Sequence, residues 1–256
     1  MQKNDIINKY LELSHLKDSF SNKIISWFIK NKRKLPWRSK ISQDNFSYLI
    51  LVSEFMLQQT QVKTTIPYFK RFVAKWPSIQ MLSKANDKDI LIFWQGLGYY
   101  SRGRNLLKSA KIIVSDYGGI IPADEEKLRI LPGIGDYTSA AIRSIAFNKK
   151  AVAIDGNVKR VIARFFGLEG TLEYNIDVIK KIAELICPNS NNRNYTQGIM
   201  ELGALICKPK NPNCSQCIVS KHCIAFNSFK TNSTPLPRKR LQKKKLKCVT
   251  YLAIKN

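Results

Sequence analysis

The sequence predicts an all-α fold with about ten helices. Apolar residues recur at the three- and four-residue spacing of amphipathic helices along most of the chain, whereas no long run alternates strictly between apolar and polar residues before Lys247. With 256 residues, of which 44% are hydrophobic, the chain can bury a sizeable core as one large domain or two small lobes. It contains no internal repeat.

The chain is strongly basic. Its 43 Lys and Arg residues against 18 Asp and Glu residues give a formal net charge of +25, and such an excess favours polyanions and makes their binding salt-dependent. Nucleic acid is therefore the leading candidate partner. No apolar run reaches the roughly 20 residues of a membrane helix, and the N-terminus lacks a signal-peptide core, so we expect a cytoplasmic, nucleoid-associated protein that does not bind membranes.

Four apolar residues at the spacing i, i+4, i+7 and i+8 predict an N-terminal helix: Phe20, Ile24, Trp27 and Phe28. This helix ends before a Leu-Pro-Trp-Arg segment, so Trp37 and Arg38 are expected on a loop. A packed tryptophan and a surface arginine are the simplest interpretation. A planar donor beside an aromatic ring also suits a base flipped out of a duplex.

The segment 48–57 is apolar at almost every position, which is typical of a helix buried on all sides. Glu54 lies in its middle. An isolated ionised carboxylate is costly there, so we expect a raised pKa, the property that a general acid needs near neutral pH. A structural ion pair is the alternative. The glutamine-rich segment 58–62 that follows suits reading of base edges or insertion into a base stack.

Further helices are expected through Trp76, up to Ser83, over 87–95 and up to Tyr117. The loop 96–102 between the last two carries glycines, a leucine and two exposed-looking tyrosines. Such a loop is often a helix C-cap with core packing, but in a basic protein it is equally consistent with a wedge inserted into DNA.

The stretch 131–160 organises the rest of the chain. Pro132, Gly133 and Gly135 cannot continue a helix, while Asp124 can cap a short helix before them and Asp136 a helix to residue 147 after them. The pattern predicts a helix, a tight hairpin and a second helix. Backbone N–H groups at the start of the second helix suit a DNA phosphate of any sequence.

Asp155 follows the apolar segment 151–154 and opens a further helix through residue 166. An N-cap role is the simplest interpretation of this carboxylate. A phosphate-binding hairpin shortly before it favours a second role in chemistry on a sugar. Helices to Cys187 and from Tyr195 to Cys207 are expected to complete the fold.

Four cysteines lie within seventeen residues near the end of the helical region: Cys207, Cys214, Cys217 and Cys223. Only one pair has the tight spacing that zinc sites usually use twice, so the spacing favours an iron–sulfur cluster over zinc. Cys187 and Cys248 fall outside the pattern. Residues 230–247 read as a basic linker, and 248–254 reads as a first β-strand.

These motifs together resemble the helix-hairpin-helix DNA glycosylases with a 4Fe-4S cluster, and within them the adenine glycosylases of MutY type. The likeness runs over about residues 20–224. The resemblance implies a six-helix barrel lobe with the hairpin over 39–149, a cluster lobe built from 1–38 and 150–229, and a remnant of a C-terminal domain over 230–256. It also implies a monomer that removes adenine mispaired with 8-oxoguanine or guanine from double-stranded DNA in base excision repair.

The same resemblance assigns chemistry to two carboxylates. Glu54 matches the general acid that protonates the departing adenine at N7, and Asp155 matches the carboxylate that stabilises the oxocarbenium-like sugar. Tyr137 and Asn157 match positions that support this pair. One neutral and one ionised carboxyl is also the logic of glycoside hydrolysis.

Other positions match base- and DNA-contacting residues of the family. Three match its adenine pocket: Trp37, Arg38 and Glu201. Six match residues that contact or wedge beside the oxidised guanine or form the hairpin: Gln59, Thr60, Leu97, Tyr99, Gly133 and Gly135. The four-cysteine loop matches the ligands of the 4Fe-4S cluster.

Two other functions are compatible with parts of this pattern. Glycosylases of endonuclease III type, which act on pyrimidines, carry a nucleophilic lysine where this chain has Tyr137, so we expect a monofunctional enzyme without efficient lyase activity. The second alternative is a non-catalytic iron–sulfur protein that binds DNA or transfers electrons. Because the family usually continues into a β-rich domain that recognises 8-oxoguanine, we also expect a weaker preference for 8-oxoguanine over guanine.

Overall fold

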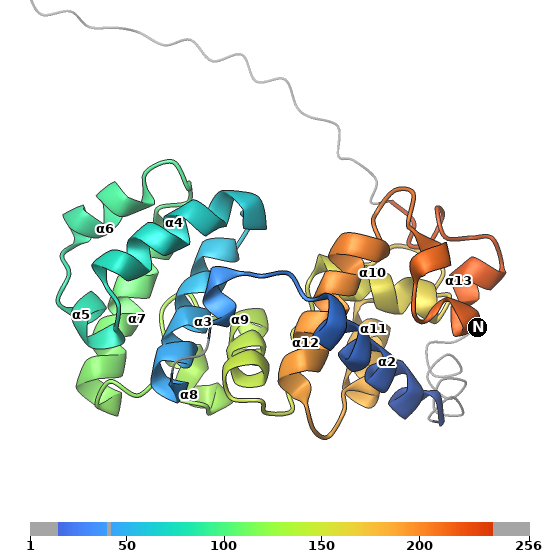
Figure 1. Cartoon of the computed structure of the whole chain (residues 1–256), viewed down its shortest axis with the longest axis horizontal. Helices are drawn as coiled ribbons and strands as arrows, with labels where there is room; N and C mark the ends of the chain where they lie inside the picture. The colour runs from blue at the N-terminus through green and yellow to red at the C-terminus, as the bar shows by residue number, and fades with distance from the viewer. Residues whose placement is uncertain (1–14, 40–41, 238–256) are drawn as a thin grey trace, which may run out of the picture.

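The computed structural model describes residues 15–39 and 42–237. This part of the chain is helical and forms two lobes that lie side by side (Figure 1). The first lobe contains α3 to α9 and the second contains α2 and α10 to α13, so the chain begins in the second lobe, crosses to the first and returns. The all-α prediction is confirmed, and the described residues contain only an isolated bridge between Thr171 and Leu236.

The first lobe packs around α3, which is buried from Phe46 to Met56 as its apolar sequence predicts. Trp94 of α6 and Phe72 of α4 meet edge to face in the same core, with ring centroids 6.1 Å apart. The elements of this lobe are α3 (Gln43–Leu57), α4 (Val62–Lys75), α5 (Ile79–Ser83), α6 (Asp87–Trp94), α7 (Ser101–Tyr117), α8 (Glu125–Ile130), α9 (Asp136–Ala141) and the π-turn η3 (Ile142–Ala146).

The second lobe has its own core, in which Phe20 of α2 packs against Phe165 with ring centroids 4.5 Å apart. Its elements are α2 (His15–Asn31), α10 (Gly156–Phe165), α11 (Ile176–Ile186), α12 (Asn192–Glu201), the π-turn η4 (Leu202–Ile206), the 3-10 turns η5 (Cys214–Gln216) and η6 (Ser220–His222), and α13 (Ile224–Asn227). Leu35 and Trp37 pack in the first core, so the predicted lobe boundary at residue 38 is wrong there.

The helix ends mostly follow the predicted capping residues. Asp124 caps α8 by accepting a hydrogen bond from the backbone N–H of Lys127, and Asp155 caps α10 by accepting from Val158. Asp136 is different. Gly135 occupies the N-cap of α9, and Asp136 instead pairs with Arg129 at 2.8 Å, so the predicted cap at Asp136 is wrong.

The lobes are joined by polar contacts as well as by the chain. Arg193 of α12 donates across the junction to the carbonyl oxygens of Ile145 and Ala146 at the end of η3, both at 2.6 Å. Within the first lobe, Gln43 of α3 also donates to Ala146, at 2.9 Å. These bonds satisfy carbonyls that a helix end leaves unpaired. Met200 of α12 packs against both cores.

Several predictions concern residues that the structure does not describe. The predicted strand over 248–254, Cys248 and the linker beyond residue 237 lie outside the described ranges. Within those ranges, no helix is both long and apolar enough to cross a membrane.

Candidate active site

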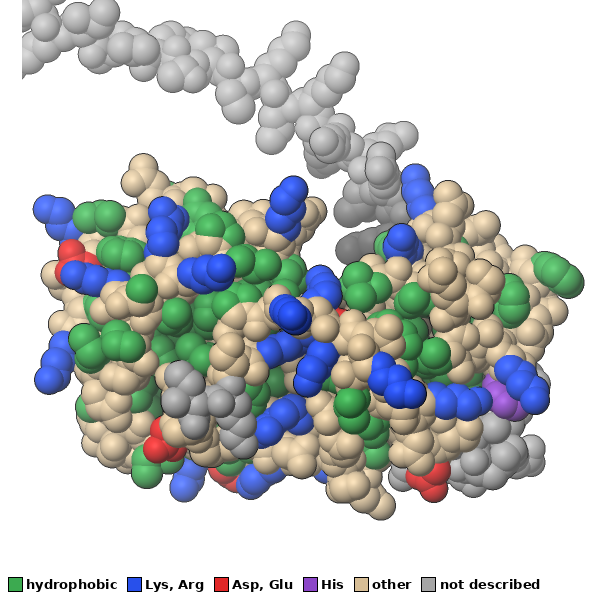
Figure 2. Space-filling model, viewed as in Figure 1, with side chains coloured by type: hydrophobic (Ala, Val, Ile, Leu, Met, Phe, Trp, Pro, Cys, Tyr) green, Lys and Arg blue, Asp and Glu red, His purple; other side chains and the backbone are tan. Residues whose placement is uncertain are grey.

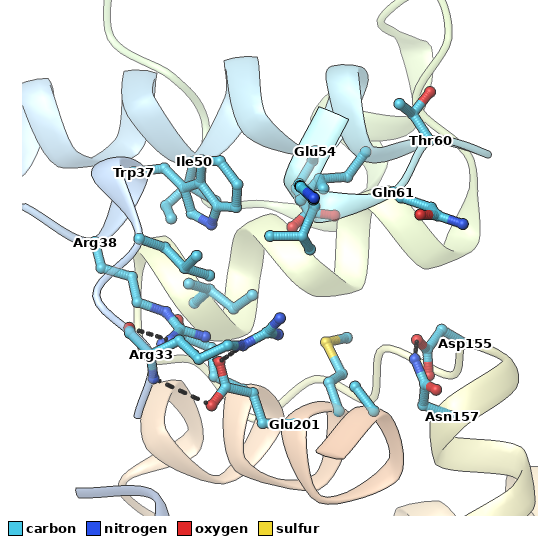
Figure 3. A pocket seen from close by; sticks show the side chains of 18 of the residues that line it. Arg33, Trp37, Arg38, Ile50, Glu54, Thr60, Gln61, Asp155, Asn157 and Glu201 are labelled. Carbon is cyan, nitrogen blue, oxygen red and sulfur yellow. Dashed lines mark hydrogen bonds and ion pairs between the residues drawn. The ribbon is translucent and has the colours of Figure 1, made fainter. Parts of the chain in front are cut away.

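A cavity of about 690 Å³ lies where the two lobes meet, and residues of both form its walls (Figure 3). It is lined from the first lobe by α3, the segment after it and Tyr137, and from the second lobe by the start of α10 and the end of α12. Eight residues that the sequence analysis assigned to catalysis, to the adenine pocket or to DNA contact line this cavity: Trp37, Arg38, Glu54, Thr60, Tyr137, Asp155, Asn157 and Glu201.

Glu54 projects into the cavity from α3 (Figure 3). It is only 6% exposed, and among the described residues it forms no ion pair, so the alternative of a structural ion pair is wrong. Burial, reinforced by the negative charge of Asp155, raises the pKa of Glu54 to about 7. The carboxyl group can therefore carry a proton near neutral pH.

Tyr137 lies at the start of α9 and forms a hydrogen bond with Glu54, which opposes the rise of the Glu54 pKa. Burial and the neighbouring carboxylates hold the pKa of Tyr137 well above its usual value. Its hydroxyl group therefore remains protonated and donates to Glu54. This hydrogen bond favours the ionised form of Glu54.

Asp155 faces the same cavity from the start of α10 (Figure 3). Its Oδ1 accepts from the backbone N–H of Val158 at 2.7 Å and its Oδ2 accepts from the Asn157 side chain at 2.7 Å. The simple N-cap interpretation is thus correct, and it does not exclude a role in the cavity. Two hydrogen bonds therefore fix the position of the carboxylate.

Asn157 connects Asp155 to the cysteine-bearing segment. Its Oδ1 accepts from Arg160 at 2.9 Å, and Arg160 in turn donates to the carbonyl oxygens of Gly203 and Cys207, both at 2.8 Å. A Cβ at Gly203 would lie only 2.6 Å from the Asn157 Cβ atom. Glycine at this position therefore lets η4 approach α10 closely.

Glu201 forms the polar end of the cavity opposite Glu54 (Figure 3). It is 1% exposed, and its Oε1 pairs with Arg38 at 2.8 Å and with Arg33 at 3.0 Å. Gln197 accepts from Nε of Arg38 at 2.8 Å. Arg38 is therefore a fixed, partly buried donor group and not the surface arginine of the simpler interpretation.

Trp37 is 5% exposed and packs edge to face on Phe69, with ring centroids 5.3 Å apart. It also lines the cavity beside Ile50. The packed-tryptophan interpretation is correct, and the packed ring gives the cavity an apolar wall. A flat apolar wall beside polar donors and acceptors suits a heterocyclic base.

The other predicted DNA-contacting residues lie outside the cavity lining. Gln59 and Tyr99 are exposed, Tyr99 by 61%. Leu97 is 6% exposed and packs in the first core, so it does not present the predicted wedge. The hairpin glycines Gly133 and Gly135 are exposed at the start of α9.

Sequence patterns did not single out several residues that line the cavity: Arg33, Lys63, Gln197 and Met200. Arg33 reaches Glu201 across 168 positions of the chain, and such a contact leaves no local signal. Gln197 lies four positions before Glu201 on α12. This helical spacing could have placed it on the same face.

Lys and Arg side chains gather over the junction of the lobes on the face seen in Figure 2, where few acidic side chains appear. Arg33 and Lys63, both basic, line the cavity itself. The net charge of the chain is therefore concentrated in part where the two lobes meet. Such a face attracts a polyanion.

The four clustered cysteines line one small pocket in the second lobe, together with Arg164. Arg164 is 3% exposed and lies 3.4 Å from the Cys207 sulfur. Four thiols around one pocket, with a buried cation beside them, fit the donor set of a thiolate-ligated cluster. Within the described ranges, however, no three potential ligands are arranged to hold a single metal ion.

Comparison with known proteins identifies the family. Residues 52–188 match the HhH-GPD family, described as "HhH-GPD superfamily base excision DNA repair protein". The chain is 42% identical over 224 residues to the adenine DNA glycosylase of Buchnera aphidicola subsp. Schizaphis graminum, covering 86% of this chain and 63% of that protein. It is 40% identical to human adenine DNA glycosylase, over 81% of this chain and 39% of that one.

Solved structures agree with this likeness. A thermostable thymine-DNA glycosylase superimposes with a TM-score of 0.72 at 30% identity, covering 83% of this chain and 97% of that one. Endonuclease III in a non-covalent DNA complex gives 0.67 at 20% identity, over 84% and 97% of the two chains, and shows the shared fold alone. The chain spans less than two thirds of the Buchnera relative. By sequence and by fold, the chain belongs to the HhH-GPD superfamily of base excision DNA repair proteins.

Proposed function

We propose that this protein is a monofunctional DNA glycosylase that hydrolyses the N-glycosidic bond of adenine mispaired with 8-oxoguanine or guanine in double-stranded DNA. One observation carries the proposal: Glu54, with a pKa raised to about 7, faces Asp155 across a cavity large enough for a base. One neutral and one ionised carboxyl is the arrangement that glycosidic bond cleavage needs.

Glu54 is the general acid in this proposal. An adenine leaves slowly as an anion, and protonation at N7 turns it into a neutral leaving group. Because the pKa of Glu54 is near neutrality, the residue holds a proton at working pH and can still release it. Tyr137 then donates to the carboxylate that forms.

Asp155 stabilises the positive charge that develops on the sugar as the base departs. Its fixed position at the N-cap of α10 means that little reorganisation is needed during the reaction. A carboxylate there can either remain an ion-pair partner or bond transiently to the sugar. A water molecule attacks the sugar to complete hydrolysis.

Arg38 and Glu201 form the base-recognising end of the cavity, with Trp37 as its wall. Arg38 uses Nε and Nη1 to bind Gln197, Glu201 and the Arg33 carbonyl oxygen. Its second terminal nitrogen can donate to a ring nitrogen of adenine, while Glu201 can accept from the exocyclic amine.

The remaining contacts position DNA. Gln59, Thr60 and Tyr99 contact the base opposite the adenine, and the hairpin at Gly133 and Gly135 binds a phosphate through backbone N–H groups. We also propose a 4Fe-4S cluster on Cys207, Cys214, Cys217 and Cys223, which would tie the basic loop between them into one structural unit. The protein is proposed to act as a monomer in the cytoplasm.

The main alternative is a glycosylase with another base preference. The 30% identity to a thymine-DNA glycosylase is the observation that favours this alternative. Higher identity to adenine glycosylases, at 42% and 40%, favours adenine. Tyr137 occupies the position of the lyase nucleophile in endonuclease III-type enzymes, which speaks against strand cleavage through a Schiff base.

Release of free adenine from duplexes containing A·8-oxoguanine, A·guanine or A·thymine tests the proposal. We expect release from the first two, none from the third, and no borohydride-trapped complex at endonuclease III levels. Glu54→Gln should abolish release while mismatch affinity is retained, and Glu173→Gln, which changes an exposed carboxylate, should release adenine normally. Release of thymine alone, or no base release by the wild type, would refute the proposal.

A further inference from the structure

Arg102 is a buried arginine without a carboxylate partner among the described residues. It is 6% exposed and lies on the first turn of α7. Its guanidinium donates only to backbone carbonyl oxygens: from Nη1 to Phe55 at 3.3 Å, Met56 at 2.8 Å and Gln58, and from Nη2 to Leu97 at 3.1 Å and Gly98 at 2.9 Å. The negative end of the α3 dipole helps to stabilise this cation.

These carbonyls belong to two segments that are distant in sequence. One segment is the end of α3 with the turn after it, and the other is the loop between α6 and α7. Arg102 also lies over the Tyr99 ring at 5.5 Å and the Trp94 ring at 5.7 Å. A single planar group therefore joins the two segments that carry Gln59 and Tyr99.

Both segments hold a non-glycine residue in the left-handed region, Gln59 at φ 56° and Tyr99 at φ 49°. This conformation is unfavourable for L-residues and persists where the surroundings impose it. The Gln58 carbonyl belongs to the peptide group directly before Gln59, and the Gly98 carbonyl to the one directly before Tyr99. Arg102 thus binds the peptide group that precedes each strained residue.

We propose that Arg102 is a positioning residue that holds Gln59 and Tyr99 at a fixed separation for contact with DNA, and that it thereby determines discrimination between mismatched and matched duplexes. The proposal rests on the proposed function, because it takes Gln59 and Tyr99 as DNA-contacting residues. Arg102 does not line the cavity of Glu54 and Asp155. Its loss should therefore affect recognition more than the chemistry of a base already in the cavity.

The test compares Arg102→Met and Arg102→Lys in the cluster-loaded full chain. Binding to duplexes with A·8-oxoguanine or A·thymine is measured in a Glu54→Gln background, so that the substrate stays intact. We expect Arg102→Met to lower the ratio of the two affinities by about tenfold or more, since two segments lose their common donor. Lysine keeps the charge but lacks the planar fork of the guanidinium, so we expect the affinity ratio of Arg102→Lys to fall as well, with a smaller loss of stability than in Arg102→Met.

Arg193→Met is the matched control. Arg193 also donates to backbone carbonyls and lies over an aromatic ring, that of Phe46 at 4.7 Å, but it joins η3 to α12 and touches neither Gln59 nor Tyr99. This variant should lose stability and keep the affinity ratio. An equal fall of the ratio in both variants would mean that Arg102 has only a general structural role.

A double-mutant cycle with Gln59→Ala separates positioning from stability. The exposed Gln59 side chain has no hydrogen bond to Arg102 in the described part of the chain, so the effects on the denaturation midpoint should add. The effects on the affinity ratio should not add, because each change disables the same contact. Additive effects on both quantities would overturn the inference. A wild-type protein that shows no mismatch preference would refute the proposed function itself, whereas a preference retained by Arg102→Met would refute only this inference.

Discussion

The raised pKa of Glu54 makes the stability of this protein depend on pH in an unusual direction. The carboxyl group has its ordinary pKa of 4.5 in the unfolded chain and about 7 in the folded one. Between these values the folded state binds more protons than the unfolded state, so its stability falls as pH rises. This contribution is fully present below about pH 4.5 and is lost as pH passes through about 7.

The size of the effect follows from the two pKa values. A difference of one pKa unit between the folded and unfolded states corresponds to about 1.4 kcal/mol. Ionisation of Glu54 should therefore reduce the free energy of unfolding by about 3 kcal/mol. Glutamine has nearly the same shape and accepts the Tyr137 hydroxyl in the same way, but it cannot ionise. We therefore expect the stability of Glu54→Gln relative to the wild type to be about 2.5 kcal/mol greater at about pH 8.5 than at about pH 5.

Urea denaturation of both proteins at a series of pH values measures this difference, with the cluster kept intact under nitrogen. Glu173→Gln serves as the control, because Glu173 is exposed and its replacement should leave the pH dependence unchanged. The informative quantity is the difference between variant and wild type, which cancels the titration of all other groups. A difference that stays constant from about pH 5 to about pH 8.5 would refute the assignment of a buried, protonatable Glu54.

Three further outcomes are expected. Asp155→Asn should abolish adenine release in single-turnover assays. Because asparagine can still cap α10, the unfolding free energy of this variant should exceed that of Asp155→Ala by about 1 kcal/mol. Equal stabilities of the two variants would contradict the capping role of Asp155. Tyr137→Phe removes a hydrogen bond that lowers the Glu54 pKa, so the alkaline limb of the rate profile should move to higher pH, and a shift to lower pH would contradict that bond. Cys217→Ser should lower iron content and visible absorbance relative to Cys187→Ser, which changes a buried cysteine outside the cluster loop; equal iron content would argue against the cluster.

Local patterns predicted the helices and the chemical groups well. The apolar run around Glu54 specified α3 and the burial of its carboxyl group, since a helix that is apolar on all sides has no other place for it. The Pro-Gly hairpin predicted where α8 ends, and the capping residues Asp124 and Asp155 predicted where α8 and α10 begin. These features depend on neighbours within a few residues, which a single sequence contains.

Contacts between distant segments could not be predicted in the same way. The pairing of Arg33 with Glu201 and the burial of Leu97 depend on how the lobes and loops pack. Asp136 had the right residue type for a cap, but Gly135 took the N-cap position and Arg129 supplied another partner. The contacts of Arg102 could not be predicted either, because its partners are backbone carbonyl groups, which every residue has.

The location of the cavity between two separately packed cores has a consequence for variants far from it. Glu54 lies on a helix of one core unit and Asp155 on a helix of the other, and Arg193 helps to hold the units together. A small rotation of one unit would change the spacing of the two acids while leaving each core intact. A substitution along this seam can therefore lower adenine release by more than its loss of stability explains, and a thermal melt alone would not report that part of the effect.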